Sequence, residues 1–162
     1  MEFNGLLHTL PREIRIFLAT FVAVLSVGFF TGLFFVSTTS AGVPDGIEKN
    51  YLGNEDDAEA EVMIFKKSER EMLTIIHTHI LSISFIFVLL GSLVWMANLP
   101  KNLKLFLTVE PFLSLLITFG GIYFLWLGVL WMKYLVFLSG MLMTATFAVS
   151  ASLVLYQLLR KS

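Results

Sequence analysis

Two histidines stand one residue apart in the stretch TIIHTHILS, close to the beginning of a long apolar run. His77 and His79 are two of only three histidines in the 162-residue chain, and positions 72–99 contain no Lys, Arg, Asp or Glu. Imidazole can ligate a metal ion or a haem iron, and inside a membrane it can also hydrogen-bond between helices. The pair is therefore the first candidate for a functional site.

The spacing of the two histidines limits the chemistry that they can do together. Successive residues on a helix are rotated by about 100°, so His77 and His79 point about 200° apart and cannot chelate one metal ion from a regular helix. His77 recurs at intervals of seven with Ser84, Gly91 and Asn98, a spacing typical of a helix-packing seam. We expect His77 to face other helices and His79 to face a second subunit, another protein or the headgroup region.

Four further residues are expected at the depth of the histidines. With a rise of about 1.5 Å per residue, both histidines lie about 8–10 Å below the outer end of their helix. The same arithmetic, applied to the two helices that follow, places two aromatic and two thioether side chains in that layer: Tyr123, Trp126, Met141 and Met143. The sequence thus predicts one histidine-centred layer, with the aromatic residues lining it.

Three functions are compatible with this layer. The first is an accessory subunit of a larger membrane assembly, such as a respiratory or redox complex, in which the histidines hydrogen-bond across helices. The second is a haem b or copper protein, with His77 or His79 and either Met141 or Met143 as ligands, because haem iron accepts His/Met pairs and copper(I) prefers thioether and imidazole. The third is a cation sensor or transporter component that uses acidic side chains. We favour the first, and we do not expect an enzyme acting on its own.

The composition is that of an integral membrane protein. Hydrophobic residues make up 57% of the chain and charged residues 14%, whereas soluble domains have about 45–50% and about 25%. The absence of cysteine excludes disulfides, thiolate metal sites and covalently attached haem. The net charge is −1 and no basic tract indicates nucleic-acid binding. The first partner that the composition predicts is therefore the lipid bilayer.

Four uncharged runs predict an all-α, polytopic bundle of four transmembrane helices. Each run exceeds the roughly 20 residues that a helix needs to cross a bilayer. The first is too long for the apolar part of a signal peptide, and no A-x-A cleavage site follows it, so we expect it to be retained. The chain is expected to form a single membrane domain over 1–162, with spans over about 15–38, 70–97, 111–132 and 134–159.

Local signals mark helix ends and packing faces. Ser68 and Glu71 fit the S-x-x-E capping box, which places a helix start there. Glu110 and Pro111 are expected to open the third span, because Pro suits a first helical position and a carboxylate complements the positive end of the helix dipole. A proton-relay role for Glu110 is the less favoured alternative. Small residues that let helices approach closely are expected at the packing faces: Gly28, Gly32, Ser84, Gly91, Gly121, Gly128 and Gly140.

The distribution of charge predicts an orientation. Residues 40–71, including a polar loop over 40–67, hold nine acids and four bases. Six basic residues flank the helix ends on the side of the termini: Arg12, Arg15, Lys101, Lys104, Arg160 and Lys161. Since basic residues accumulate on the cytoplasmic side, we expect both termini in the cytoplasm and residues 40–71 outside, in the periplasm of a bacterium.

The stretches GIEKNYLGNEDD, KSEREML, HTHILS, EPF and TFGG together resemble uncharacterised small four-helix bacterial inner-membrane proteins. Those proteins have an outer acidic loop followed by an H-x-H helix. The resemblance spans roughly residues 40–140 and implies an inner-membrane location and a role for His77 and His79. It implies no reaction. A membrane-protein partner or a homo-oligomer is expected in addition to the lipid.

Overall fold

The computed structural model describes residues 4–55, 57 and 59–160, and it is helical and free of strands over these residues. Four helices are long and apolar enough to cross a membrane. This confirms the predicted all-α, four-span architecture. The helices are α1 (Leu6–Thr9), α2 (Arg12–Ser40), α3 (Pro44–Leu52), α4 (Glu69–Met96), α5 (Lys101–Trp126) and α6 (Met132–Leu159).

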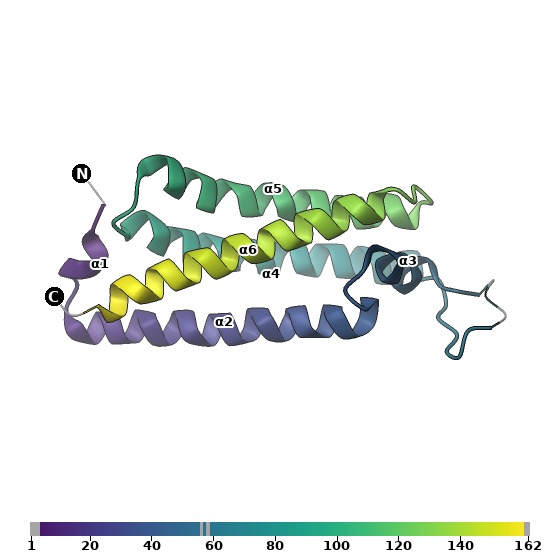
Figure 1. Cartoon of the computed structure of the whole chain (residues 1–162), viewed down its shortest axis with the longest axis horizontal. Helices are drawn as coiled ribbons and strands as arrows, with labels where there is room; N and C mark the ends of the chain where they lie inside the picture. The colour runs from purple at the N-terminus through teal and green to yellow at the C-terminus, as the bar shows by residue number, and fades with distance from the viewer. Residues whose placement is uncertain (1–3, 56, 58, 161–162) are drawn as a thin grey trace.

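The four long helices run side by side, as Figure 1 shows. The short helix α1, the two ends of the chain and the α4–α5 turn lie at one end of the bundle, which we call the terminal end. Helix α3 and the segment after it lie at the opposite end, which we call the acidic end. Helix α6 packs against α5, α2 and α4, while α4 packs mainly on α5. Helices α5 and α6 therefore form the centre, and α2 and α4 flank them.

An aromatic cluster joins three of the helices. The rings of Phe29 on α2 and Phe147 on α6 stack with centroids 3.8 Å apart and an interplanar angle of 6°. Phe87 on α4 meets both rings edge-on, at 6.3 Å from Phe29 and 6.1 Å from Phe147. Offset-stacked and edge-to-face aromatic pairs stabilise beyond the area that they bury. This cluster fixes how α2 and α4 are placed against α6.

Helix α5 differs from the predicted third span. The prediction of 111–132 was wrong at both ends, because α5 begins at Lys101 and ends at Trp126. Charge near the start does not prevent helix formation, since the ammonium group of Lys104 is satisfied by Asn4 Oδ1 at 2.9 Å and the Trp95 carbonyl at 2.7 Å. Gly128, with φ of 100°, takes the left-handed conformation that follows the end of α5. Pro111 consequently lies inside the helix.

The predicted loop over 40–67 contains a helix that the sequence pattern did not reveal. Helix α3 has Pro44 in its first turn, which suits the fixed φ of proline. Gly46 is needed because a Cβ at this position would lie 1.8 Å from the carbonyl oxygen of Ser40. The close approach turns the chain sharply after α2 and places α3 across the acidic end.

Candidate functional site

Helix α4 carries the predicted histidines, and its first turn is fixed as expected. The amide of Glu71 donates to Ser68 Oγ at 3.4 Å, and the amide of Ser68 donates to Glu71 Oε2 at 2.8 Å. Both bonds of the predicted capping box are therefore present. They define the start of α4 and hence the position of each histidine along it.

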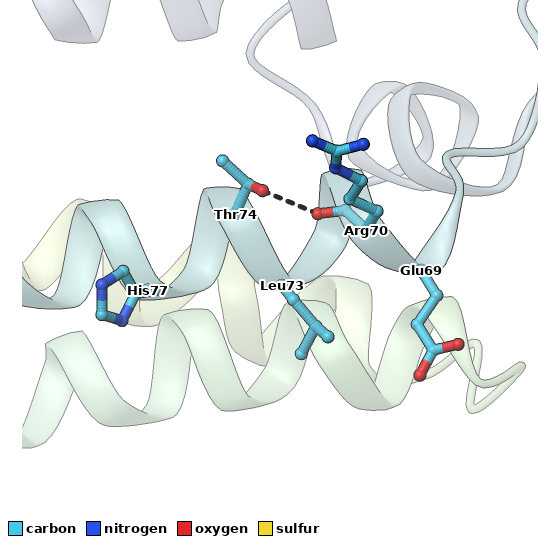
Figure 2. Close-up of a pocket in the computed structure, with 5 residues that line it drawn as sticks. All are labelled: Glu69, Arg70, Leu73, Thr74 and His77. Atoms are coloured by element: carbon cyan, nitrogen blue, oxygen red, sulfur yellow. Dashed lines mark hydrogen bonds between the residues drawn. The ribbon is translucent and has the colours of Figure 1, made fainter.

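His77 lies on the outward face of α4. Its side chain is exposed and makes no hydrogen bond to any described residue. Figure 2 shows it in a shallow groove that also involves Glu69, Arg70, Leu73 and Thr74, all from α4 itself. Thr74 Oγ1 donates to the Arg70 carbonyl at 2.7 Å, so this hydroxyl is satisfied within the helix. The prediction that His77 faces the other helices of the chain was wrong.

His79 is the histidine that contacts another helix. Its ring stacks on Phe119 of α5, with centroids 5.2 Å apart and an interplanar angle of 28°. Its Nδ1 lies 2.8 Å from the carbonyl oxygen of Ile75. A carbonyl oxygen can only accept, so Nδ1 carries the proton in this bond. Both histidines are exposed, but His79 and not His77 contacts α5, which is the opposite of the predicted assignment.

The other residues of the predicted layer differ in burial and in their contacts. Met141 is 56% exposed on the surface of α6, whereas Met143 is 8% exposed and belongs to the core. Tyr123 and Trp126 stack on one another with centroids 6.0 Å apart. The described residues contain no group of three or more His, Cys, Asp or Glu side chains that could hold a metal ion. Ligation of haem or copper by His77 or His79 together with Met141 or Met143 stays a prediction.

Trp126 has a different role from the predicted lining of a cofactor site. Its indole Nε1 donates to the carbonyl of Lys67 at 2.8 Å, and the ammonium group of Lys66 lies 5.1 Å from the centroid of its ring. A cation over an indole face is attracted by the ring quadrupole. Trp126 thus anchors the polar segment, residues 53–68 between α3 and α4, to the end of α5.

The polar segment is itself held together by two hydrogen bonds of the Asn54 side chain. The Asn54 side chain donates to the Val62 carbonyl at 3.0 Å and accepts from the Ile64 amide at 2.6 Å. Gly53 has φ of 85°, and a Cβ there would lie 2.7 Å from the Ile64 carbonyl oxygen. This position therefore requires glycine, and the two arms of the segment approach closely.

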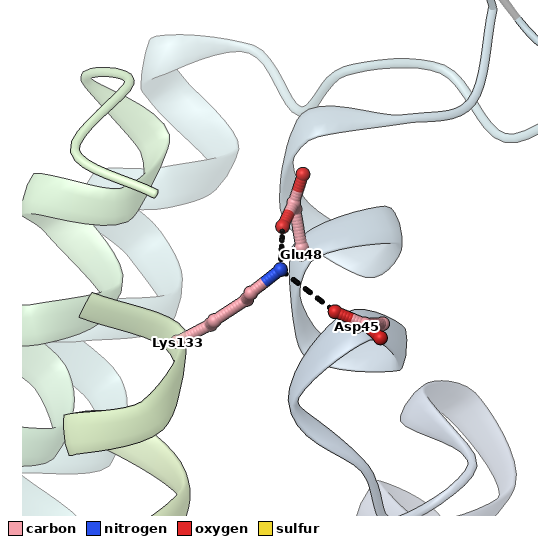
Figure 3. A network of polar contacts seen from close by, with 3 residues as sticks. All are labelled: Asp45, Glu48 and Lys133. Atoms are coloured by element: carbon pink, nitrogen blue, oxygen red, sulfur yellow. Dashed lines mark hydrogen bonds and ion pairs between the residues drawn. The ribbon is translucent and has the colours of Figure 1, made fainter. Parts of the chain in front are cut away.

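Helix α3 is fastened to α6 by charge. Lys133 Nζ lies 2.7 Å from Asp45 Oδ1 and 2.7 Å from Glu48 Oε2, as Figure 3 shows. The hydrogen bond from Lys133, reinforced by its charge, lowers the pKa of Asp45 below the ordinary value of 3.8. Part of the acidic charge of residues 40–71 is therefore used to hold the fold together.

The residues predicted to form packing faces differ in their surroundings. Gly91 and Gly121 pack within the chain: a Cβ would lie 3.3 Å from Thr108 Cγ2 and 2.7 Å from Val136 Cγ2, respectively. Gly128 is exposed in the turn after α5, and Ser84 is half-buried. Around Gly28, Gly32 and Gly140 a Cβ would meet nothing within 4 Å. Gly28 and Gly32 therefore do not pack within this chain.

The burial of an acid in the interior of α5 was not predicted from the sequence. Glu110 is 7% exposed and lies in the helix interior, so its predicted place at a helix start was wrong. Ser114 Oγ donates to Glu110 Oε1, and the other carboxylate oxygen has no partner among the described residues. Two features of the sequence could have indicated a buried acid here. Glu110 is the only Asp or Glu after position 71, and it is followed by Ser at i+4.

Residues 42–162 match the family model Aq_1264_TM, described as a transmembrane helical domain, so the chain belongs to this family. The matched region includes α3 to α6 and leaves out the whole of α2. No curated protein and no solved structure gives a significant match. The family confirms the resemblance to uncharacterised membrane proteins and assigns no reaction.

Proposed function

Because the chain belongs to a family of transmembrane helical domains, we propose that it is a small membrane subunit that binds other transmembrane helices laterally. The observation that carries this proposal is the difference in burial between its helices. Within the most apolar part of each span, 50% of α5 and 39% of α6 is buried, but only 11% of α2 and 11% of α4. Two of the four spans thus have few buried residues and leave one side uncovered by the rest of the chain.

The exposed surface of α4 is not purely apolar. Thr78 and Ser82 lie on it together with His77, and Ser82 Oγ donates to the Thr78 carbonyl at 2.7 Å. The imidazole of His77 has no such internal bond. Helix α4 is about 42 Å long and the hydrocarbon layer about 30 Å thick, so His77, about 12 Å along α4, lies just inside the apolar region. A polar group there is stabilised by a hydrogen bond to a neighbouring helix.

Helix α2 offers a second surface for close contact. Gly28 and Gly32 form a GxxxG spacing on its exposed side, with Thr31 between them. Small residues at this spacing let two helix backbones approach, which favours association in a bilayer where hydrophobic burial adds little. We infer that α2 and α4 receive helices of a membrane-protein partner or of a second copy of the chain.

Photo-crosslinking in native membranes tests this proposal. A photoreactive amino acid at Leu81, one turn after His77, should give a crosslinked product whose mass is the sum of the masses of this chain and a second protein. The matched control is Leu138 on α6, which is also exposed. It lies at the same depth, because Phe119 stacks on His79 while the adjacent Thr118 bonds Ser139. Leu138 should give no protein adduct.

Absence of a protein adduct at Leu81 would show that this surface of α4 faces lipid and would refute the lateral-binding proposal. The purified protein also tests the alternatives in which His77 or His79 binds haem b or copper. A Soret absorption band or stoichiometric copper would favour a redox site formed with a partner or a second copy. A colourless, metal-free protein that copurifies with a membrane protein supports the accessory role.

A further inference from the structure

Glu110 is an acid without a counter-ion in the middle of a candidate membrane span. It lies nine residues after the start of α5, about 13 Å along the helix axis. The ion pairs of the described residues involve Lys133 only, at the other end of the bundle. Ionisable residues inside a membrane are expensive and usually functional, so the surroundings of this carboxyl group decide what it can do.

The carboxyl group is only partly satisfied. Ser114 Oγ donates to Oε1, whereas Oε2 is buried and has no partner among the described residues. On α6, the hydroxyl of Ser150 is likewise buried without a partner. Pro111 lacks an amide proton, so the carbonyl of Leu107 is deprived of its usual i+4 donor. Hydrogen-bonding groups on both helices are therefore left without a partner among the described residues.

The register of α5 and α6 places these groups in one interface. Thr118 and Ser139 are hydrogen-bonded at 2.7 Å, and a Cβ at Gly121 would lie 2.7 Å from Val136 Cγ2. The helices are antiparallel, so two turns from Thr118 toward the terminal end bring Glu110 to the level of residues 146–147. Ser150 lies one turn beyond. The free carboxylate oxygen and the free hydroxyl thus occupy the same buried α5/α6 contact.

No charged group faces Glu110 from the helices packed around it. Residues 16–40 of α2, 72–96 of α4 and 134–159 of α6 contain no Asp, Glu, Lys or Arg. His79 stacks on Phe119, nine residues or about 13 Å from Glu110, and His77 lies farther along α4 in the same direction. Tyr156 is exposed on α6. On α5, Lys104 is bound to Asn4 and the Trp95 carbonyl.

We propose that Glu110 is a proton-binding site in the membrane interior, formed at the α5/α6 contact with Ser114 and Ser150. An uncompensated carboxylate in apolar surroundings is strongly disfavoured, whereas a neutral carboxylic acid needs only hydrogen-bond partners. A hydroxyl can both donate and accept. Ser114 and Ser150 can therefore support the acid before and after it releases its proton, by reorienting their own hydroxyl groups.

The ligand is a proton rather than a metal ion because of the available donors. Hard cations such as Ca²⁺ take about 6–8 oxygen ligands, and no second carboxylate lies in this interface. A proton needs one carboxylate oxygen and one acceptor, which are present. This inference does not depend on lateral binding by α2 or α4.

Infrared difference spectroscopy on the full chain in lipid vesicles tests the site. Lowering the pH should produce carbonyl stretching absorption of protonated carboxylic acids that shifts when side-chain-labelled glutamate is incorporated. Because the chain has 12 acidic residues, the Glu110 band is the component that is present in the wild type and absent from Glu110→Gln. Ser114→Ala should move it to higher frequency, because the hydrogen bond to Oε1 is removed. Ser92→Ala is the matched control and should leave it unchanged, since Ser92 Oγ is exposed and donates to the carbonyl of Val88.

Three outcomes would overturn the proposal. They are a Glu110 component that does not change with pH, an acid absorption in Glu110→Gln that is identical to that of the wild type, and an absorption whose frequencies are all the same in Ser114→Ala as in the wild type. The Ser114→Ala variant keeps Glu110 intact, so it remains decisive if Glu110→Gln does not fold. Replacing sodium by a bulky organic cation should not shift the titration, and a sodium-dependent shift would identify a metal cation instead.

Discussion

His77 and His79 differ in role although one residue separates them. The rotation of about 200° between them puts His79 against Phe119 and leaves His77 on the outward face of α4. His79 stabilises the chain through this contact, and His77 is available to a neighbouring protein. Substituting each histidine therefore separates folding from assembly.

We predict that His79→Ala lowers the stability of the purified protein by about 1 kcal/mol, because the stacked pair with Phe119 is lost. His77→Ala should change it by less than about 0.5 kcal/mol, since the side chain is exposed and unbonded. Thermal unfolding in mild detergent measures both values. In membranes, His77→Ala should instead weaken the crosslink from Leu81. Equal losses of stability for the two variants would contradict this assignment.

At the scale of an element, α3 is held against the bundle by charge as well as by apolar contacts. Lys133 provides two hydrogen-bonded ion pairs to it. Ile47 and Tyr51, both on α3, pack in and against the apolar core, and burial raises the pKa of Tyr51. Helix α3 has only nine residues, and isolated helices that short are marginal in water. Its order therefore depends on docking, and the docking depends on charge.

We predict that α3 loosens at acidic pH and in Lys133→Met. Lys133 lowers the pKa of Asp45, so the stabilisation by Asp45 is fully present above 3.8 and is lost as the pH falls through the lowered value. Hydrogen exchange of the α3 amides, corrected for intrinsic rates, measures the loosening. Asp45→Asn should expose α3 at neutral pH, whereas Glu61→Gln, which removes an exposed and unbonded carboxylate, should not. Unchanged α3 protection in Lys133→Met would show that apolar contacts alone suffice.

At the scale of the whole molecule, the two ends of the bundle differ in charge. Arg12, Arg15, Lys101, Lys104 and Arg160 lie at the terminal end, where Arg15 also donates to the Leu158 carbonyl at 2.7 Å. The acidic residues of α3 and the segment after it lie at the other end. This arrangement is typical of a protein whose termini face the cytoplasm.

We predict that residues 40–71 face the periplasm of a bacterial inner membrane. The chain contains no cysteine, so single cysteines report on topology without background. An impermeant thiol reagent applied to intact cells should label Glu61→Cys and should not label Lys101→Cys until the membrane is permeabilised. Both positions are exposed. Labelling of Lys101→Cys alone would reverse the orientation.

The sequence by itself determined the number of spans, the helical class and the start of α4. These are local properties, because a long uncharged run must satisfy its backbone hydrogen bonds within itself. The capping box of Ser68 and Glu71 is equally local, since the two residues are three positions apart. The spans over 15–38, 70–97 and 134–159 agree with α2, α4 and α6 to within three residues at each end.

Only the tertiary structure decided which faces are buried and where α5 begins. Whether His77 or His79 contacts α5 depends on which side of α4 meets α5, and a helical sequence with polar residues on both sides does not specify this. Lys104, in the first turn of α5, donates to Asn4 from a segment 100 positions away, a contact that the local sequence does not reveal. Because α5 begins at Lys101, Glu110 lies in the helix interior, where it is buried.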